Sequence, residues 1–474
     1  MNDVLARLRA LQAGDLPTHG GSTLAYVYDS GLAEADEIGR QALAMFGATN
    51  GLDPTVFPSV REFENDLVTH AARLLHGPPG TVGTVTSGGT ESILLAVQAA
   101  RDSRPEVDRP SLVLPSTAHA AFHKAAHYFG VQVVVVDVDP ATFRADPEAM
   151  AAACDDTTVL VVASAPSYAH GVIDPVPAIA EAAAARDIRC HVDACIGGWI
   201  LPYLDDCPDF DFVVPGVTSV SVDLHKYAYT PKGASILLHR TAALRRSQFF
   251  AHADWPGYTM LNATTQSTKS GAPVAAAWAV VRHIGDEGYR RLAATAVTAT
   301  RRLAATADGI DGLTVVAEPA TTLFAVRTDE RADVFTLADE LAARGWFVQP
   351  QLAFRGQPPS LHFTISAATA ARYDDLVAAL TASVVAAQQA GPVQVAPELA
   401  QAAQGLDPDT LDDAAFDGLL ELAGLSAGGN ESGVRLPARM APVNALLNVA
   451  PPRLREALLI AFLDRLMRPA PGPG

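Results

Sequence analysis

The chain has 474 residues, of which 49% are hydrophobic and 18% charged, a balance typical of a globular protein with more than one domain. Its formal net charge of −18, from 34 lysines and arginines against 52 acidic residues, argues against a nucleic-acid or anionic-membrane partner. The four cysteines lack CxxC spacing, the first residues lack the apolar core of a signal peptide, and no apolar run reaches membrane-spanning length. We therefore expect a cytoplasmic protein with reduced thiols and no transmembrane segment.

The first part of the chain, residues 1–57, is weakly patterned and is interpreted as an N-terminal arm or cap that includes a helix at 34–46. From residue 58, short β-branched runs alternate with helical segments. This alternation predicts a large domain at 58–285 with a mostly parallel sheet covered by helices on both faces. The expected strands are residues 82–86, 112–114, 133–136, 159–164, 188–192, 217–222 and 236–238.

The remaining chain begins with a long helical region, 274–307, in which Gly285 and Gly288 allow a bend. A smaller α/β domain is expected at 286–390, with strands at 314–316, 323–326, 347–348 and 361–365. From residue 391 the composition shifts toward Ala, Gly, Pro and Asp. We interpret 391–474 as an appended helical tail, with amphipathic helices expected at 411–422 and 454–467.

One candidate binding motif is Thr-Ser-Gly-Gly-Thr-Glu-Ser at 86–92, which follows an expected strand and opens an expected helix. The unpaired backbone N–H groups and the positive end of a helix favour a phosphate there, and Gly88, Gly89 and Thr90 allow it to approach closely. A tight turn without any ligand is the alternative for so short a motif.

Two further stretches place ionisable side chains at the ends of buried strands. Asp193 needs a partner, which is either the next helix or a protonated heteroaromatic nitrogen. Lys226, preceded by His225, follows the strand expected at 217–222. Because an amine forms an imine only when neutral, we expect burial or neighbouring cations to lower the pKa of Lys226 from about 10.4. A solvated loop lysine is the alternative.

Together the three stretches predict a pyridoxal phosphate site, in which the glycine motif holds the phosphate, Asp193 keeps the pyridine nitrogen protonated and Lys226 binds the aldehyde. His119 precedes an expected helix after another strand, and its imidazole is placed to stack on the ring. The combination is much more specific than any of its parts.

The sequence resembles the fold-type-I pyridoxal phosphate enzymes of the group II decarboxylase family, and within that family the sphingosine-1-phosphate lyases. The resemblance extends over about residues 27–387 and rests on blocks such as VFPSVREFENDL, TVTSGGTESILLA, APSYAHGVIDPVP, HVDACIGGW and SVSVDLHKYAYTPKGAS. It implies that Lys226 attaches the cofactor, that Asp193 contacts the pyridine nitrogen and that His119 stacks on the ring. It also implies that Gly89, Thr90 and His225 bind the cofactor phosphate, and that the protein is a homodimer with shared active sites.

The resemblance further implies retro-aldol cleavage of a phosphorylated long-chain amino alcohol to an aldehyde and phosphoethanolamine. Tyr28 and Tyr168 resemble tyrosines near the substrate that assist at its β-hydroxyl, although either can be a packing residue. An unperturbed phenol, with a pKa of about 10, is a poor base at neutral pH, so a neighbouring lysine has to assist.

The substrate-binding positions depart from the family pattern. The family sequence Asn-Pro-Leu-His-Pro is here Asn-Gly-Leu-Asp-Pro at 50–54, so that Asn50 is kept but Asp53 replaces a histidine associated with the substrate phosphate. An anion at that position should repel a phosphate. The position of an arginine-containing loop of the family is occupied here by Thr268 and Lys269, and Lys269 keeps a positive charge but lacks the guanidinium group. Lys232 matches the family pattern.

Three functions remain open on this evidence. The extended block matches favour a carbon-carbon lyase that acts on a phosphorylated, lipid-like amine. An amino-acid α-decarboxylase uses the same scaffold, and Asp53 favours a substrate with a cationic side chain. A non-catalytic pyridoxal-binding assembly protein is disfavoured, because Lys226, Asp193 and His119 are all intact.

Overall fold

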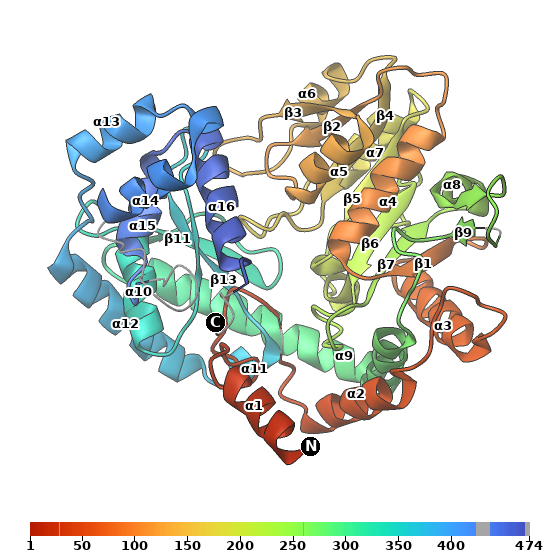
Figure 1. The fold of residues 1–474 in the computed structure, drawn as a ribbon, viewed down its shortest axis with the longest axis horizontal. Helices are drawn as coiled ribbons and strands as arrows, with labels where there is room; N and C mark the ends of the chain where they lie inside the picture. The colour runs from red at the N-terminus through yellow and green to blue at the C-terminus, as the bar shows by residue number, and fades with distance from the viewer. Residues whose placement is uncertain (28, 259, 423–436, 470–474) are drawn as a thin grey trace. The chain divides into compact units, whose positions relative to one another are not determined.

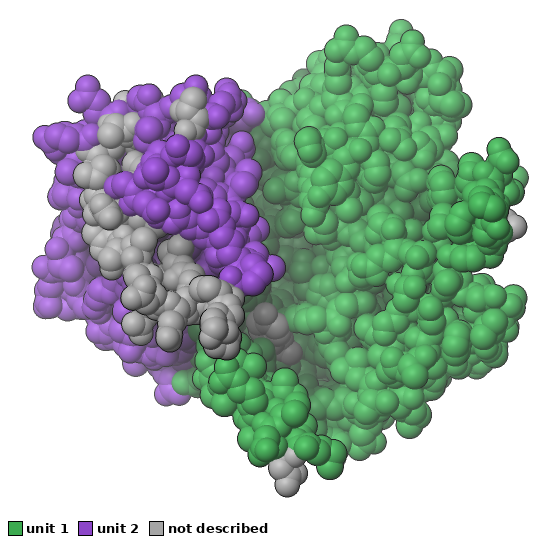
Figure 2. Space-filling model, in the orientation of Figure 1, with its two compact units in different colours: residues 1–304, 317–324, 364–373 green, residues 305–316, 325–363, 374–474 purple. Residues whose placement is uncertain are grey.

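A computed structural model of the chain describes residues 1–27, 29–258, 260–422 and 437–469. Two compact units are distinguished (Figures 1 and 2). The first comprises residues 1–304, 317–324 and 364–373, and the second comprises 305–316, 325–363 and 374–474. The chain therefore passes between the units several times, and each unit is described separately below.

The first unit is built around a seven-stranded sheet. Its strands are β1 (Val82–Thr86), β2 (Ser111–Pro115), β3 (Gln132–Val136), β4 (Thr158–Ser164), β5 (Arg189–Asp193), β6 (Ser219–Asp223) and β7 (Ser235–His239). Their order is β1-β7-β6-β5-β4-β2-β3 (Figure 1). Strands β2 to β6 run parallel, whereas β7 is antiparallel to both β1 and β6. The predicted, mostly parallel sheet is confirmed.

Side chains alternate between two cores along the central strands, which is why these strands read as continuous apolar runs. On β2, Leu112 and Leu114 pack in one cluster with Phe122, while Val113 lies in the other with Ile179.

The helices and short 3-10 turns of this unit are α1 (Asn2–Gln12), α2 (Ala33–Phe46), α3 (Pro58–Leu74), α4 (Gly89–Asp102), α5 (Ala121–Phe129), α6 (Pro147–Ala152), α7 (Val176–Ala184), η1 (Gly197–Trp199), η2 (Leu201–Tyr203), α8 (Ala242–Arg245), η3 (Arg246–Gln248) and α11 (Ala367–Ala370). A separate hairpin pairs β8 (Phe250–His252) with β9 (Met260–Asn262).

The long helix α9 (Gly271–Asp308) bends where the sequence predicted that it could. Gly285 has φ 65° and ψ 167°, which lie outside the helical region. Only glycine adopts such a conformation readily, so the bend follows from this residue.

The second unit contains a four-stranded sheet in the order β10-β11-β13-β12. Its strands are β10 (Leu313–Val315), β11 (Leu323–Thr328), β12 (Gln349–Gln351) and β13 (Ser360–Thr364). The helical elements are α10 (Val334–Ala343), α12 (Tyr373–Ala390), α13 (Pro397–Gly405), η4 (Pro408–Thr410), α14 (Asp413–Leu422), α15 (Ala441–Val449) and α16 (Pro452–Leu466). Helices α14 and α16 lie where the two helices of the tail were predicted, although α16 leaves Leu459, Ile460 and Leu463 exposed. No helix in the described parts of the chain combines the length and hydropathy that a membrane crossing requires.

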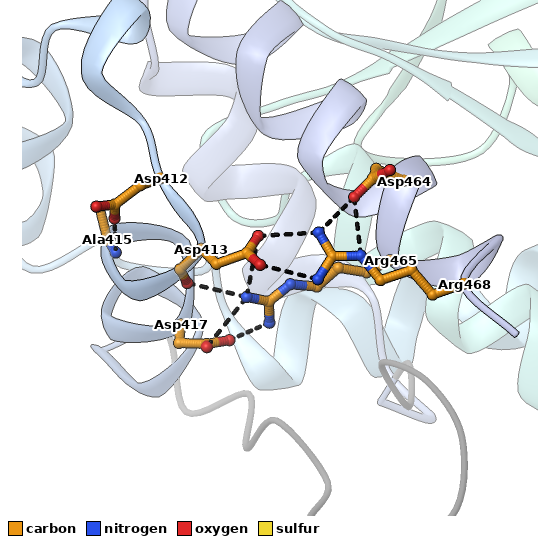
Figure 3. Close-up of polar contacts among 7 residues, drawn as sticks. All are labelled: Asp412, Asp413, Ala415, Asp417, Asp464, Arg465 and Arg468. Carbon is orange, nitrogen blue, oxygen red and sulfur yellow. Dashed lines mark hydrogen bonds and ion pairs between the residues drawn. The ribbon is translucent and has the colours of Figure 1, made fainter. Parts of the chain in front are cut away.

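Arginine side chains of the tail join α14 to the end of α16 (Figure 3). Arg465 pairs with Asp417 and donates to the backbone carbonyl of Asp413, while Arg468 binds the carboxylates of Asp413 and Asp464. The Arg465 guanidinium also lies over the ring of Phe416, 5.1 Å from its centroid. These contacts show that the arginines of α16 are engaged within the tail itself.

The tail is also attached to the sheet-bearing part of its own unit through α10. Arg439 forms an ion pair with Glu340, at 2.8 Å. The backbone N–H groups of Met440 and Ala441, at the start of α15, donate to the carboxylate of Asp339. A carboxylate at this end of a helix satisfies unpaired donors and complements the helix dipole.

Candidate functional site

A pocket of about 380 Å³ opens at one edge of the large sheet, within the size range of small-molecule sites. The strands β1, β4, β5 and β6 end at this edge with Thr86, Ser164, Asp193 and Asp223. The pocket is lined by Ser87, Gly88, Gly89, Thr90, Glu91, Ile93, His119, Ser164, Pro166, Tyr168, Asp193, Cys195, Ile196, Asp223, His225 and Lys226. All three chemically interpreted stretches of the sequence therefore meet here, because parallel strands present their carboxyl ends together.

The glycine motif forms the wall of the pocket at the start of α4. A Cβ added to Gly89 would lie 2.8 Å from both Cys195 Sγ and Asp223 Oδ1, so only glycine fits there without displacement. The carboxylate of Glu91 accepts hydrogen bonds from the backbone N–H groups of Ser87, at 2.6 Å, and Thr265, at 2.9 Å. Glu91 thus fixes the glycine turn and leaves the first N–H groups of the helix as candidate anion donors.

Asp193 lies at the end of β5 with only 8% of its surface exposed. Its Oδ1 accepts hydrogen bonds from the backbone N–H of Cys195, at 3.1 Å, and from Ser221 Oγ, at 3.4 Å. Ser221 lies directly opposite Asp193 in the parallel pairing of β5 with β6. No described residue hydrogen-bonds Oδ2, so this oxygen can accept a proton donor from a ligand in the pocket.

Lys226 pairs with a carboxylate that the sequence analysis did not single out. Its Nζ lies 3.0 Å from Asp223 Oδ2. Burial alone would lower the pKa of Lys226, but attraction to Asp223, with smaller contributions from Cys195 and Asp193, outweighs burial and raises the pKa above its ordinary value. The expectation of a lowered pKa is therefore wrong for the free amine seen here, and the reason is the charge of Asp223.

His225 also faces Asp223, with its Nε2 3.6 Å from Oδ2. Its Nδ1 is buried without a hydrogen-bond partner among the described residues. Burial lowers the pKa of His225, and the Asp223 carboxylate opposes that effect. An unsatisfied buried nitrogen beside the glycine motif indicates a missing polar ligand.

His119 and Tyr168 both line the pocket. The backbone N–H of Ala121 donates to His119 Nδ1 at 3.1 Å, which holds the ring at the start of α5. Tyr168 donates its hydroxyl to the carbonyl of Ala25, and burial raises the pKa of this phenol to about 12. Tyr28, the other predicted tyrosine, lies outside the described residues.

Two of the predicted substrate residues, Asn50 and Lys269, lie together and away from the pocket lining. Asn50 Oδ1 accepts a hydrogen bond from the backbone N–H of Lys269, and an isolated bridge pairs Asn50 with Ser270. Lys269 Nζ pairs with Glu64 at 2.8 Å and donates to the carbonyl of Val85. The structure thus joins two segments that are distant in sequence, but neither Asn50 nor Lys269 is among the residues that line the pocket.

Three other predicted substrate residues also lie outside that lining. Thr268 is exposed. Asp53 is exposed and accepts hydrogen bonds from Thr55, which lower the pKa of its carboxyl. Lys232 Nζ donates to the carbonyls of Val27, at 2.6 Å, and His225, at 2.7 Å. Burial and the nearby charge of Lys226 lower the pKa of Lys232 to about 8.

Asp223 is the main pocket residue that sequence reasoning missed. The same signal that singled out Asp193, an acidic residue ending a β-prone run, also marked Asp223 three positions before Lys226. Cys195 and Glu91 lay inside the quoted motifs, but nothing in their residue type indicated that they border the pocket.

Comparisons with known proteins extend the resemblance. Residues 33–328 match the family described as pyridoxal-dependent decarboxylase conserved domain. Residues 397–465 match a family described as pyridoxal-dependent enzyme, C-terminal putative HTH domain.

Among curated proteins, the chain is 37% identical to a sphingosine-1-phosphate lyase of Dictyostelium discoideum over 77% of this chain and 69% of that protein. It is 36% identical to sphingosine-1-phosphate lyase 1 of Rattus norvegicus over 77% of this chain and 64% of that protein. A solved sphingosine-1-phosphate lyase of Burkholderia pseudomallei superimposes with a TM-score of 0.77 at 33% identity, covering 82% of this chain and 91% of that one.

Proposed function

Because the chain belongs to the pyridoxal-dependent decarboxylase family, we propose that it is a lyase that cleaves the Cα–Cβ bond of a phosphorylated long-chain amino alcohol by a retro-aldol reaction. The products would be a long-chain aldehyde and phosphoethanolamine. The observation that carries this proposal is the pocket in which Gly89, Asp193, His119 and Lys226 converge, in a chain whose likeness to sphingosine-1-phosphate lyases covers most of its length.

The residues present fit pyridoxal phosphate. The backbone at Gly89 packs directly against Cys195 and Asp223, and the buried Nδ1 of His225 beside this turn lacks a partner among the described residues, as expected of a group that faces a phosphate. The Oδ2 atom of Asp193 is available to a protonated ring nitrogen. When bound, the cofactor supplies an electron-withdrawing ring that stabilises negative charge on a substrate carbon.

We assign the following roles to the chain's own residues. Lys226 supplies the amine that holds the cofactor aldehyde, Gly88, Gly89, Thr90 and His225 bind its phosphate, and His119 covers its ring. Because the phenol of Tyr168 carries its proton at neutral pH, it orients the substrate hydroxyl. Lys232 lies outside the pocket lining and is mostly protonated at neutral pH because its pKa is about 8, so we assign to its charge the assistance of that hydroxyl's deprotonation, with Tyr28 as a candidate base.

The covalent attachment is tested with the purified protein, pyridoxal phosphate and borohydride. We expect a reduced adduct at Lys226 in the wild type, located by peptide mass spectrometry, and none in Lys226→Ala. A wild type that takes up the cofactor without any reducible lysine adduct would overturn the proposal.

An α-decarboxylase is the second candidate, because the exposed carboxylate of Asp53 replaces the histidine found in the lyase pattern and favours a cationic substrate. The two reactions are separated by their products. Incubation with phosphorylated long-chain bases and with amino acids, monitored for aldehyde and for carbon dioxide, should give aldehyde only. Release of carbon dioxide from an amino acid at the higher rate would favour the decarboxylase.

We also propose that the active form is a cytoplasmic homodimer in which Thr268, Lys269 and the 50–54 segment act near the partner's substrate. The four free cysteines support a reducing compartment. Mixing inactive Lys226→Ala chains with inactive Lys269→Ala chains should then restore activity in heterodimers. If subunits exchange but activity does not return, Lys269 serves its own chain, through Glu64.

A further inference from the structure

Asp223 is a buried carboxylate at the centre of the pocket, with only 2% of its surface exposed. It ends strand β6, and the antiparallel pairing with β7 places Ser235 directly opposite. Ser235 Oγ donates to Asp223 Oδ1 at 2.6 Å, which fixes one carboxylate oxygen. The other oxygen, Oδ2, therefore has a defined direction toward Lys226 and His225.

The charge of Asp223 is well compensated. Burial raises the pKa of its carboxyl, but Lys226, His225 and the hydrogen bond from Ser235 outweigh burial and lower the pKa below its ordinary value. When Lys226 becomes neutral, His225 and Ser235 remain beside the carboxylate. Asp223 is thus not left as an isolated buried charge, which would be strongly unfavourable.

The charged and titratable groups that face Lys226 come from several elements. Asp223 is on β6, Asp193 and Cys195 are at the end of β5, and His225 is on the same loop. Lys226 in turn acts through its charge on Lys232 and Tyr168, where it favours the deprotonated form of each. Among these groups, Asp223 is the one in direct ionic contact, at 3.0 Å.

We propose that Asp223 is a positioning residue for cofactor capture, which holds the amine of Lys226 beside the glycine motif and sets the pH at which that amine becomes reactive. The inference rests on the proposed pyridoxal phosphate function. The ammonium group must lose one proton to solvent before its lone pair can attack the aldehyde carbon. The remaining two amine protons and the carbonyl oxygen then leave as water, so no oxidant or reductant is required.

The pKa values of two neighbouring lysines are shifted in opposite directions, that of Lys226 upward by Asp223 and that of Lys232 downward by burial and the charge of Lys226. Lys226 keeps its proton to high pH because a carboxylate lies against it, whereas Lys232, which donates to the carbonyls of Val27 and His225, has a pKa of about 8. Lys232 is therefore an internal reference for Lys226 within the wild-type protein.

The first experiment measures reductive methylation of the cofactor-free wild type with formaldehyde and cyanoborohydride as a function of pH, read for each lysine by mass spectrometry. We expect half-maximal labelling of Lys232 near pH 8 and of Lys226 at a higher pH. Labelling of Lys226 at or below the midpoint of Lys232 would refute the role of Asp223, and this result does not depend on any variant folding.

The second experiment measures the pH midpoint for formation of the borohydride-reducible adduct with pyridoxal phosphate in wild type, Asp223→Asn and Ser235→Ala. We expect the midpoint of Asp223→Asn to fall by at least about one pH unit, which is about tenfold in the fraction of neutral amine. Ser235→Ala keeps the carboxylate but removes the hydrogen bond that fixes its Oδ1, so its midpoint should lie between those of the wild type and Asp223→Asn. Absence of an adduct in wild type would instead refute the cofactor proposal, whereas equal midpoints in wild type and Asp223→Asn would refute this inference alone.

Discussion

Replacement of Gly89 by alanine tests whether the glycine motif is built for a close ligand. The added Cβ would lie 2.8 Å from Cys195 Sγ and from Asp223 Oδ1, closer than side chains normally approach. Neither atom can retreat easily, because both residues are buried and Asp223 is held by Lys226 and Ser235. The strain therefore falls on groups that line the pocket in which we propose that the cofactor binds.

Overpacking of this kind costs about 1–3 kcal/mol, which corresponds to about a 5- to 150-fold change in an equilibrium constant. We expect the dissociation constant of pyridoxal phosphate to rise by a factor in this range in Gly89→Ala. The assay is a spectrophotometric titration of the cofactor-free protein, with thermal unfolding measured in parallel to detect strain that is present before the cofactor binds.

Gly88→Ala is the matched control. Its added Cβ would meet His225 Cε1 at 3.7 Å, an ordinary contact, and the backbone of Gly88 is extended, with φ 171°. Gly88→Ala should then unfold close to the wild-type temperature, because its added Cβ strains no contact within the protein. If Gly89→Ala binds the cofactor as tightly as the wild type and unfolds at the same temperature as Gly88→Ala, the close-packing explanation of the motif is wrong.

Three further predictions concern the substrate, the buried histidines and the tail. Asp53→His should lower the KM for phosphorylated long-chain bases and leave that for unphosphorylated bases and cofactor binding unchanged; equal effects on both substrates would contradict charge repulsion by Asp53. Burial lowers the pKa of His191 to about 4 in the folded protein. As the pH falls below about 6.5, His191 is therefore protonated in the unfolded chain before it is protonated in the folded protein, and the free energy of unfolding decreases. At pH 5, which is 1.5 units below the ordinary pKa of 6.5, this decrease is about 2 kcal/mol. Denaturant unfolding at pH 7 and pH 5 should therefore show a change in unfolding free energy that is about 2 kcal/mol smaller in His191→Gln than in the wild type. Arg465→Ala should speed hydrogen exchange in α14 and α16 more than Arg453→Ala does. The reason is exposure, because the Arg465 side chain is 13% exposed whereas the Arg453 side chain is 73% exposed and its ion pair is screened by solvent. Equal exchange rates in the two variants would show that the ion pairs of Arg465 with Asp413 and Asp417 do not hold these helices together.

The sequence by itself determined most of the elements and several of the residues that line one pocket. Strand and helix periodicity are local properties, so the alternation from residue 58 onward predicted the mostly parallel sheet found in the structure. Lys226, Asp193 and Gly89 were singled out because each follows or ends a buried strand. In a parallel sheet such positions share one edge, which is why residues far apart in the chain could be assigned to one pocket without coordinates.

Only the tertiary structure decided which charges face one another. The insertion of β7 between β1 and β6 puts Ser235 opposite Asp223, and this pairing aims the carboxylate at Lys226. As a result the pKa of Lys226 is raised, although burial alone would lower it. Likewise, Lys269 meets Glu64 because strand order and loop paths bring these segments together. Periodicity in a sequence reports which side of an element is buried, whereas electrostatic interactions depend on distances between segments that are separated along the chain.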